Sequence, residues 1–435
     1  MPDDGKSKEE VVNRLTERFR KLLQERLPDE PGTLEEIERV TEEIGKEVKR
    51  DVESECVDVH GSGYAGPRLT CSCGKEAFFK THYEKRVVTL SSELVISRAY
   101  YHCEVCGRGF TPLDEKLELD RLCTSVGVRT KLARLAAWIP FGQVSLEFEE
   151  LCGVHLSKNT AQSVAEAMGR CVREESSRRE EVVLSGLAPM PKEGPKRLYI
   201  GIDGTCAPMR GGGWREVKTS VIYETAERDG KTSVVNPEYL ATLERTERFG
   251  EQVYARAFDR GVENAEEIVA LGDGAAWVWK SHSHHYPRAV QILDFFHASE
   301  HLNEVARAWY GEGTDKARRW VEAREVDLLS DCVETVIRSI QSWGPADEDA
   351  SEIRRKNLVY FMNNKERMRY ATFKAQGYHI GSGLVESACK TVVGQRLKQS
   401  GMRWSEAGAE AMLSLRSHIL THRTPDLRPY ARAIA

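Results

Sequence analysis

Residues 197–205 read RLYIGIDGT, and this stretch decides the fold. Its apolar residues predict a short buried β-strand that ends at Asp203, and the glycine after the acid suits a turn. A carboxylate at the carboxyl end of a buried strand lies at the edge of a sheet, where α/β proteins place their ligands. The stretch therefore predicts an α/β domain with Asp203 at a functional edge.

The same strand–acid pattern occurs twice more, as EIVALGDG at 267–274 and VQILDFFH at 290–297. It places Asp273 and Asp294 after short apolar strands, and WREVKTSVIYE at 214–224 predicts a further strand between the first two acids. One such aspartate is usually a loop or cap residue. Three in one α/β region favour a metal site, because carboxylate oxygens are the ligands that hard cations prefer.

A fourth acid stands far along the chain in GSGLVESA at 381–388. Small residues precede a helix here, and Glu386 falls in its first turn. We expect this carboxylate to point from the helix towards the sheet. A glutamate at this position is also a routine capping residue, so both interpretations stay open.

Two cysteine pairs, CSCG at 71–74 and CEVCG at 103–107, flank residues 85–102, where apolar and polar residues alternate. Two β-hairpin turns that each present two thiolates can hold one tetrahedral Zn²⁺. CxC departs from the usual CxxC spacing, and unpaired buried thiols are the alternative. Cys56, Cys123 and Cys152 are expected in the core. The predicted ligands of a structural zinc are Cys71, Cys73, Cys103 and Cys106.

Residues 124–180 have a helical pattern that resembles a helix-turn-helix. A first helix is expected over 144–151, a turn at Gly153, and an N-cap at Ser157 for a second helix. A plain helical hairpin is the alternative. The side chains that would contact DNA from the start of the second helix are Lys158, Asn159 and Thr160.

The formal net charge of −5 and the pI of about 6.2 argue against a nucleic-acid partner, but the charge is unevenly placed. Residues 1–56 hold 11 basic and 17 acidic residues, whereas residues 351–435 hold 15 basic and 6 acidic ones. Three basic residues after Glu386 would neutralise phosphates near the acids, with a solvated basic helix as the alternative. They are Arg396, Lys398 and Arg403.

The 435 residues correspond to about three domains by length. We predict a multidomain α+β protein, with an acidic helical region over 1–60, a zinc-ribbon-like module over 64–113, a helix-turn-helix region over 124–180 and a catalytic domain over 195–420. The charged start and the lack of an apolar run of roughly 20 residues predict a cytoplasmic protein. The odd number of 11 cysteines indicates reduced thiols.

The motifs IDGT, LGDG, LDFFH and GSGLVES, in this order, resemble those of bacterial insertion-sequence transposases of the ISKra type, which group with the Mutator-like DDE transposases. The resemblance covers about 64–417. It implies a ribonuclease H-like catalytic domain with a helical insertion at about 298–380. Asp203, Asp273 and Glu386 would then bind two Mg²⁺ or Mn²⁺ ions, and Asp294 with His297 matches the family's D-x-x-H element. The CxCG knuckle departs from the expected zinc pattern.

The resemblance implies a nucleoid-associated bacterial enzyme that cleaves and joins element ends, acting on double-stranded DNA as a homo-oligomer. Two alternatives stay open. One is a metal-dependent nuclease of the same fold that performs no strand transfer, and the other is a catalytically silent DNA-binding regulator. His297 is expected near the reacting phosphate, with a buried, non-catalytic histidine as the alternative.

Overall fold

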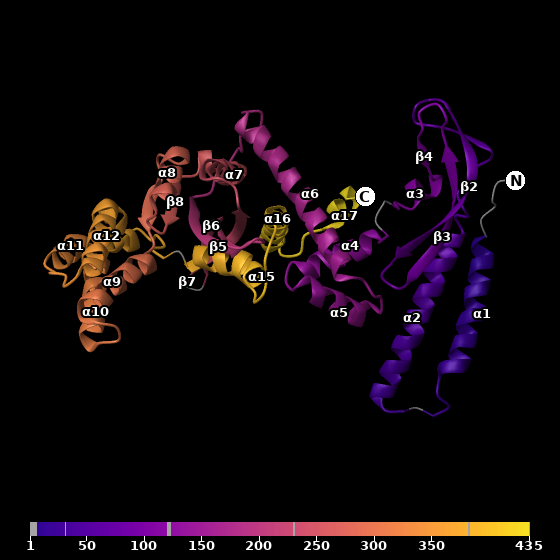
Figure 1. Ribbon diagram of the computed structural model, residues 1–435, viewed down its shortest axis with the longest axis horizontal. Helices are drawn as coiled ribbons and strands as arrows, with labels where there is room; N and C mark the ends of the chain where they lie inside the picture. Colours follow the sequence, from indigo (N-terminus) through magenta and orange to yellow (C-terminus); the bar gives the residue numbers. More distant parts are fainter. Residues whose placement is uncertain (1–6, 31, 120–122, 229–230, 382, 435) are drawn as a thin grey trace. The chain divides into compact units, whose positions relative to one another are not determined.

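The computed structural model describes residues 7–30, 32–119, 123–228, 231–381 and 383–434. The chain forms two compact units, one of Met1–Cys171 with Asp426–Ala435 and one of Val172–Pro425. Each unit combines helices with a sheet, so the predicted multidomain α+β class is confirmed (Figure 1).

The first unit begins with a helical hairpin of α1 (Lys8–Arg26) and α2 (Leu34–Asp58). Each helix starts with a capping box, in which the hydroxyl of Ser7 or Thr33 accepts from the backbone N–H three residues on. The helical spacing of the apolar residues, with Leu22 and Ile44 buried, gives each helix one face to pack. The predicted N-terminal helices are confirmed.

A four-stranded antiparallel sheet follows, in the order β1-β2-β3-β4. Its strands are β1 (Arg68–Thr70), β2 (Glu76–Val88), β3 (Glu93–His102) and β4 (Gly109–Phe110). Ala99 and Tyr101 are buried on one face, as the alternating pattern requires. The short helix α3 (Pro112–Lys116) completes this module.

Four further helices belong wholly or partly to the first unit. They are α4 (Val126–Ala136), α5 (Phe141–Cys152), α6 (Lys158–Leu184) and the C-terminal α17 (Arg428–Ala433). The buried guanidinium of Arg129 donates to the carbonyl of Ala431 over 2.7 Å and so ties α17 to α4. Helix α6 belongs to the first unit as far as Cys171 and to the second unit beyond it.

The second unit is built on a five-stranded sheet in the order β7-β6-β5-β8-β9. The strands are β5 (Arg197–Pro208), β6 (Trp214–Arg228), β7 (Lys231–Thr242), β8 (Glu267–Gly272) and β9 (Val290–Leu293). Strands β5 to β7 pair antiparallel, whereas β8 and β9 run parallel to β5. An antiparallel meander thus extends into a parallel edge.

One predicted strand boundary is wrong. Strand β5 does not end at Asp203 but continues to Pro208, because its antiparallel hydrogen bonds with β6 run on to that residue. Its parallel pairing with β8, in contrast, stops at Gly201. Asp203 therefore lies where β5 loses one of its two neighbours.

Helices pack around this sheet and form a cluster beside it (Figure 1). The first are α7 (Thr246–Asp259), α8 (Ala276–His285) and α9 (Phe295–Tyr310), and the predicted insertion is helical, with α10 (Asp315–Leu329), α11 (Val333–Gln341), α12 (Glu348–Asn364) and α13 (Tyr370–Ala375). The chain returns through α14 (Gly383–Ala388), the π-helix η3 (Cys389–Gly394), α15 (Gln395–Leu397) and α16 (Glu406–His422).

The predicted core positions of three cysteines are not observed, since Cys56 and Cys123 are exposed and Cys152 is partly buried. Their small side chains leave both environments open to them, and the local pattern did not distinguish the two. Within the described ranges, no helix combines the length and apolar character that crossing a membrane requires.

Candidate functional site

The three predicted aspartates of the second unit lie on neighbouring strands at one level of the sheet. Gly201 pairs with Leu271, and Gly272 pairs with Leu293. Continuing this register by one or two residues places Asp203, Asp273 and Asp294 side by side across β5, β8 and β9. The parallel pairing thus brings together carboxylates that are up to 91 positions apart in the sequence.

Asp203 is partly buried, and both of its oxygens accept hydrogen bonds. Oδ1 accepts from the backbone N–H of Gly204 over 2.6 Å, and Oδ2 accepts from the thiol of Cys389 over 3.2 Å. Burial raises the pKa of this carboxyl group, and the charge of Asp273 raises it further. A divalent cation would relieve this repulsion between like charges.

Asp273 follows β8 directly, and its backbone is tied to the helical region. Its Oδ1 accepts from the backbone N–H of Ala275 over 2.9 Å, and its carbonyl oxygen accepts from the hydroxyl of Tyr360 over 2.8 Å. The Tyr360 ring stacks on His301 with 3.6 Å between ring centroids. Helix α12, which carries Tyr360, therefore helps to fix the turn that presents Asp273.

Asp294 is 1% exposed and caps helix α9. Its Oδ1 accepts from the backbone N–H groups of Phe296 and His297, over 2.5 and 3.0 Å. The ring of His297 lies nearby, with Nδ1 3.7 Å from the same oxygen. The Asp294 carboxylate raises the pKa of His297 to about 9 against the effect of burial, and Asp203 and Asp273 add to the rise. His297 is therefore a cation at neutral pH, set among carboxylates.

Glu386 is on α14, the helix that packs on β5. Val385 touches the strand at Gly201, where an added Cβ would lie 2.1 Å from Val385 Cγ2. The carboxylate of Glu386 instead forms an ion pair with Lys390, one turn further on. In the described part of the chain, three or more metal-ligating atoms come within 4.8 Å of one another only at the four cysteines. The predicted convergence of Glu386 with the aspartates is thus not seen in this structure, and the ligand oxygens of Asp203, Asp273 and Asp294 do not all come within 4.8 Å of one another either. Ser382 of the same motif lies outside the described residues.

The helix after Glu386 widens into the π-helix η3. Arg416, which is 1% exposed, donates hydrogen bonds to backbone carbonyl groups of this π-helix. The guanidinium donates to the Val392 carbonyl over 2.7 Å and also to that of Thr391. π-Helical turns are frequent at functional sites, and this one carries Cys389 to Asp203.

One predicted DNA contact is wrong, and two remain exposed. Arg396 is fully buried, and its guanidinium carbon lies 4.9 Å from the ring centroid of Trp404, so it supports the fold and does not meet solvent. Lys398 is exposed and donates to the hydroxyl of Thr205, two residues from Asp203. Arg403 is exposed next to Trp404.

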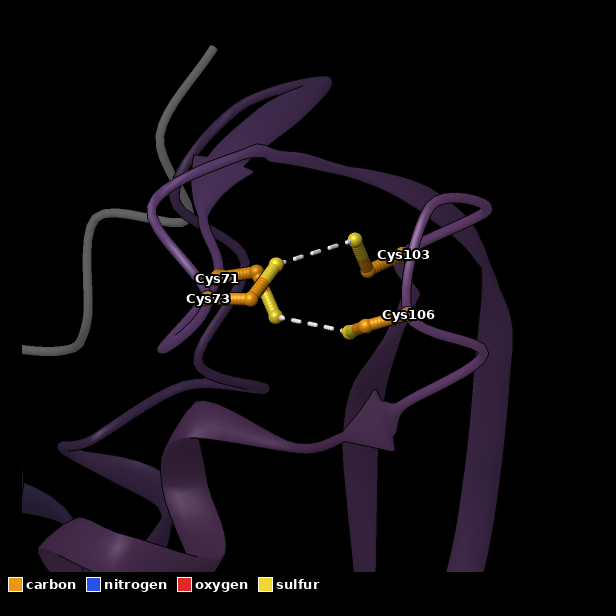
Figure 2. Close-up of side chains that lie close together, drawn as sticks. All are labelled: Cys71, Cys73, Cys103 and Cys106. Atoms are coloured by element: carbon orange, nitrogen blue, oxygen red, sulfur yellow. Dashed lines mark hydrogen bonds between the residues drawn. The ribbon is translucent and has the colours of Figure 1, made fainter.

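The four predicted zinc ligands form a second candidate site, in the first unit (Figure 2). Cys71 and Cys73 lie in the β1–β2 turn, and Cys103 and Cys106 lie in the β3–β4 turn. The Sγ atoms of Cys71 and Cys106 are 3.6 Å apart, and those of Cys73 and Cys103 are 3.7 Å apart. Four thiolates about 2.3 Å from a tetrahedral zinc lie roughly 3.8 Å from one another, so this cluster fits such an ion.

Glycine allows both cysteine turns to close. Gly74 and Gly107 have φ angles of 78° and 72°, a conformation that other residues adopt only with strain. Gly74 N–H donates to the carbonyl of Cys71, and Gly107 N–H donates to that of Cys103. The CxC turn is closed by a bond that spans three residues and the CxxC turn by one that spans four, and the shorter spacing does not prevent the cluster.

The helical region of the first unit has the predicted local structure. Gly153 ends α5 with a φ of 67°, and the Ser157 hydroxyl accepts from the N–H of Thr160 over 3.1 Å at the start of α6. Lys158 and Asn159 are exposed, and Thr160 is partly buried. The two helices and the cap are confirmed, whereas DNA recognition by this region stays a prediction.

Some residues of the second unit escaped the sequence interpretation. Cys389 contacts Asp203 across 186 positions, and Arg416 holds the π-helix that carries Cys389; no local pattern marks either residue. His282 is fully buried against the Leu271 carbonyl, and burial lowers its pKa to about 4. The 3.6-residue spacing from Val278 and Trp279 was the signal for a buried helix face.

Comparison of the sequence with known proteins identifies relatives of this chain. It is 24% identical over 322 residues to the "UPF0236 protein in vanSb 3'region" of Streptococcus gallolyticus, which covers 71% of this chain and 66% of that protein. It is also 24% identical over 352 residues to "UPF0236 protein TTE2489" of Caldanaerobacter subterraneus subsp. tengcongensis, with 79% and 70% covered. The chain thus spans about two thirds of the length of these relatives.

A third relative, from the same Caldanaerobacter strain, has a name that joins eleven designations from TTE0033 to TTE2212. It is 24% identical over 351 residues, which cover 79% of this chain and 69% of the relative. A family model described as "Uncharacterised protein family (UPF0236)" matches residues 74–424, well over half of the chain. The chain therefore belongs to the UPF0236 family.

Proposed function

We propose that this chain is a metal-dependent DNA transposase of the DDE type, which cleaves and joins the ends of an insertion sequence. The observation that carries the proposal is the pairing of β5, β8 and β9, whose register continues to Asp203, Asp273 and Asp294 and sets the Asp273 charge where it raises the pKa of the Asp203 carboxyl group. Carboxylate oxygens are the ligands that Mg²⁺ or Mn²⁺ prefers, and these carboxylates would have to draw closer together to share an ion. The meander extended by two parallel strands is compatible with the ribonuclease H-like domain that the motifs imply.

Divalent ions bound here would activate a water or a DNA 3′-hydroxyl and stabilise the leaving oxygen in an in-line displacement at phosphorus. The residues of the chain have separate tasks. Asp203 and Asp273 supply ligand oxygens, and Cys389 and the Gly204 N–H orient Asp203. His297 carries a proton at its ring and offers a positive charge to a phosphate oxygen.

The name of the third relative adds independent support. Eleven designations for one protein in one strain are what repeated copies of a coding sequence would produce. Transposition multiplies a coding sequence within a genome in this way. A nuclease or a regulator gives no such reason for repetition.

The first unit would supply DNA and metal binding. We propose that the four cysteines hold a structural zinc in a ribbon-like module, and that Lys158, Asn159 and Thr160 contact the terminal repeats from the start of α6. Lys398 and Arg403 would meet the backbone of double-stranded DNA beside Asp203. Joining two element ends implies a homo-oligomer on DNA, in a bacterial nucleoid.

A catalytically silent DNA-binding regulator is the second candidate, and one observation favours it. The ion pair of Glu386 with Lys390 leaves the third family acid away from the aspartates. A transposase must break this pair when metal and DNA bind, so that Glu386 can reach the aspartates. A regulator without catalysis has no need of Glu386 at the aspartates, so the pair can stay intact.

A strand-transfer assay distinguishes these functions. Labelled DNA with the sequences that flank the coding region is incubated with plasmid and Mg²⁺, and joined product is scored against simple cleavage. Because metal ligands act as a unit, Asp203→Asn, Asp273→Asn and Glu386→Gln should each lower joining by roughly 10³-fold or more. Asp349→Asn, at an exposed acid of α12, is the matched control and should keep full activity.

Cleavage without joining would show a nuclease. DNA binding with neither reaction would show a regulator. Full joining by any one of the three variants would remove that acid from the proposed site.

A further inference from the structure

Phe296 is a large apolar side chain that stands exposed within the aspartate cluster. It follows Asp294 by two residues, precedes His297, and is 58% exposed. In the described part of 172–425, the only other aromatic side chain as exposed is Trp214, at the start of β6. Isolated apolar residues are ordinary on protein surfaces, so the exposure of Phe296 matters because of its position.

The backbone holds this ring in place. The Phe296 N–H donates to Asp294 Oδ1 over 2.5 Å, and the N–H of Phe295 donates to the carbonyl of Ile380 over 3.0 Å. The ring lies against Gly381, where an added Cβ would be 3.1 Å from Phe296 Cε2. Phe296 is therefore bonded to Asp294 through its backbone, and its ring lies against the segment that leads into α14.

The neighbouring Phe295 has the opposite environment. Its ring packs edge-on against Tyr370, which is fully buried, at a centroid distance of 5.4 Å. The core of the helical cluster is thus completed by Phe295. The Phe296 ring meets this core only at its edge, through the Phe295 ring at a centroid distance of 6.0 Å, and stays 58% exposed.

We propose that Phe296 stacks on a nucleobase of the DNA strand whose phosphate lies at Asp203 and Asp273. This inference rests on the proposed function and names a partner group for the same site. A row of carboxylates repels the DNA backbone, whereas a base offers an uncharged flat face to an aromatic ring. Stacking tolerates any sequence, because every base has such a face. The contact holds the nucleotide beside the reacting phosphate without adding charge.

Photochemical cross-linking of the full chain tests this contact in buffer without added Mg²⁺ or Mn²⁺, so that the proposed strand cleavage does not occur and zinc at the four cysteines is not removed. The probe is an oligothymidylate that contains 5-bromodeoxyuridine, and mass spectrometry maps the cross-linked peptides. The expected result is a cross-link at Phe296 that Phe296→Ala abolishes. The same variant should lower affinity for the oligothymidylate on the order of tenfold, with Phe296→Tyr restoring it.

Two controls separate stacking from general effects. An abasic oligomer of the same length should bind equally well to the wild type and to Phe296→Ala, since it has no base to stack. Val326→Ala, which truncates a side chain of α10 that is 63% exposed, should leave the cross-link and the affinity unchanged.

Cross-links confined to other peptides, or an equal loss on the abasic oligomer, would overturn the inference. A wild-type chain that binds neither probe would overturn it together with the proposed function. A Phe296 cross-link in a chain that performs no strand transfer with Mg²⁺ would support the contact and reject the transposase alone.

Discussion

The pKa of His297 depends on the charges of all three aspartates of the site. Its pKa is raised from about 6.5 to about 9, chiefly by the Asp294 carboxylate. A raised pKa in the folded state means that the protonated ring stabilises the fold. This contribution is complete below pH 6.5 and disappears as the pH rises through 9.

We therefore expect His297→Gln to destabilise the metal-free protein at low pH and to have little effect at high pH. The difference in free energy of unfolding should be at most roughly 3 kcal/mol below pH 6.5, and it should vanish above pH 9. Chemical unfolding in buffer without added Mg²⁺ or Mn²⁺ at both pH values measures it. His284→Gln, at an exposed histidine of α8, is the control. A difference that grows with pH would contradict the assigned ion pair.

Among the elements, the contact of α14 with β5 decides where Glu386 stands. Gly201 leaves no room for a side chain beneath Val385. We expect Gly201→Ala to cost about 1–3 kcal/mol in the free energy of unfolding, because a Cβ would overlap Val385 Cγ2. Val385→Ala removes that methyl group, so the double variant should recover part of the loss.

A double-mutant cycle by chemical unfolding gives the coupling between the two positions. Coupling of at least about 0.5 kcal/mol is expected for residues in direct contact. Strictly additive losses would show that α14 does not pack on β5 in solution. Val336→Ala, a buried valine of α11, combined with Gly201→Ala serves as the uncoupled pair.

The elements themselves were largely predictable from sequence, whereas their contacts were not. Apolar periodicity located the strands that end just before Asp273 and Asp294. The N-cap residue located the start of α6 at Lys158. Periodicity reports which residues are apolar but not which strand will pair with which. For this reason the continuation of β5 past Asp203 was missed, since it depends on pairing with β6.

Side-chain partners at the site were less predictable still. The burial of Arg396 depends on Trp404 folding back over it, and the thiol of Cys389 meets Asp203 across 186 positions. The ion pair of Glu386 with Lys390 competes with the site that the motif predicts. Such choices are settled by packing, which single-sequence patterns do not encode.

At the scale of the whole molecule, the net charge of −5 is the sum of an acidic N-terminal region and a basic C-terminal region. The acidic residues gather in the N-terminal helices, where several form ion pairs within the hairpin, such as Arg14 with Glu55 and Arg18 with Asp51. The basic excess lies in residues 351–435. The basic excess of this segment is therefore a local property that the total charge of the chain conceals.

Because the chain forms two units, we expect zinc bound at the four cysteines to stabilise chiefly the module that holds it. Ligation of a small β-module contributes directly to its folding, and the sheet β1–β4 has few other buried residues to hold it. We expect the purified chain to hold about one equivalent of zinc, and chelation to release it. Hydrogen exchange should then rise at the amides of β2 and β3 and stay slow in β5 and β8, which belong to the other unit.

Matched cysteine variants test the same point without a chelator. Cys106→Ser removes one ligand and should lose most of the zinc, with the same local rise in exchange. Cys332→Ser, at an exposed cysteine of the second unit, should keep the metal. Zinc retained by Cys106→Ser would show that the four thiols are not the ligands. A rise in exchange throughout β5 and β8 would show instead that the two units unfold together, so that the metal stabilises the whole chain and not only the module that holds it.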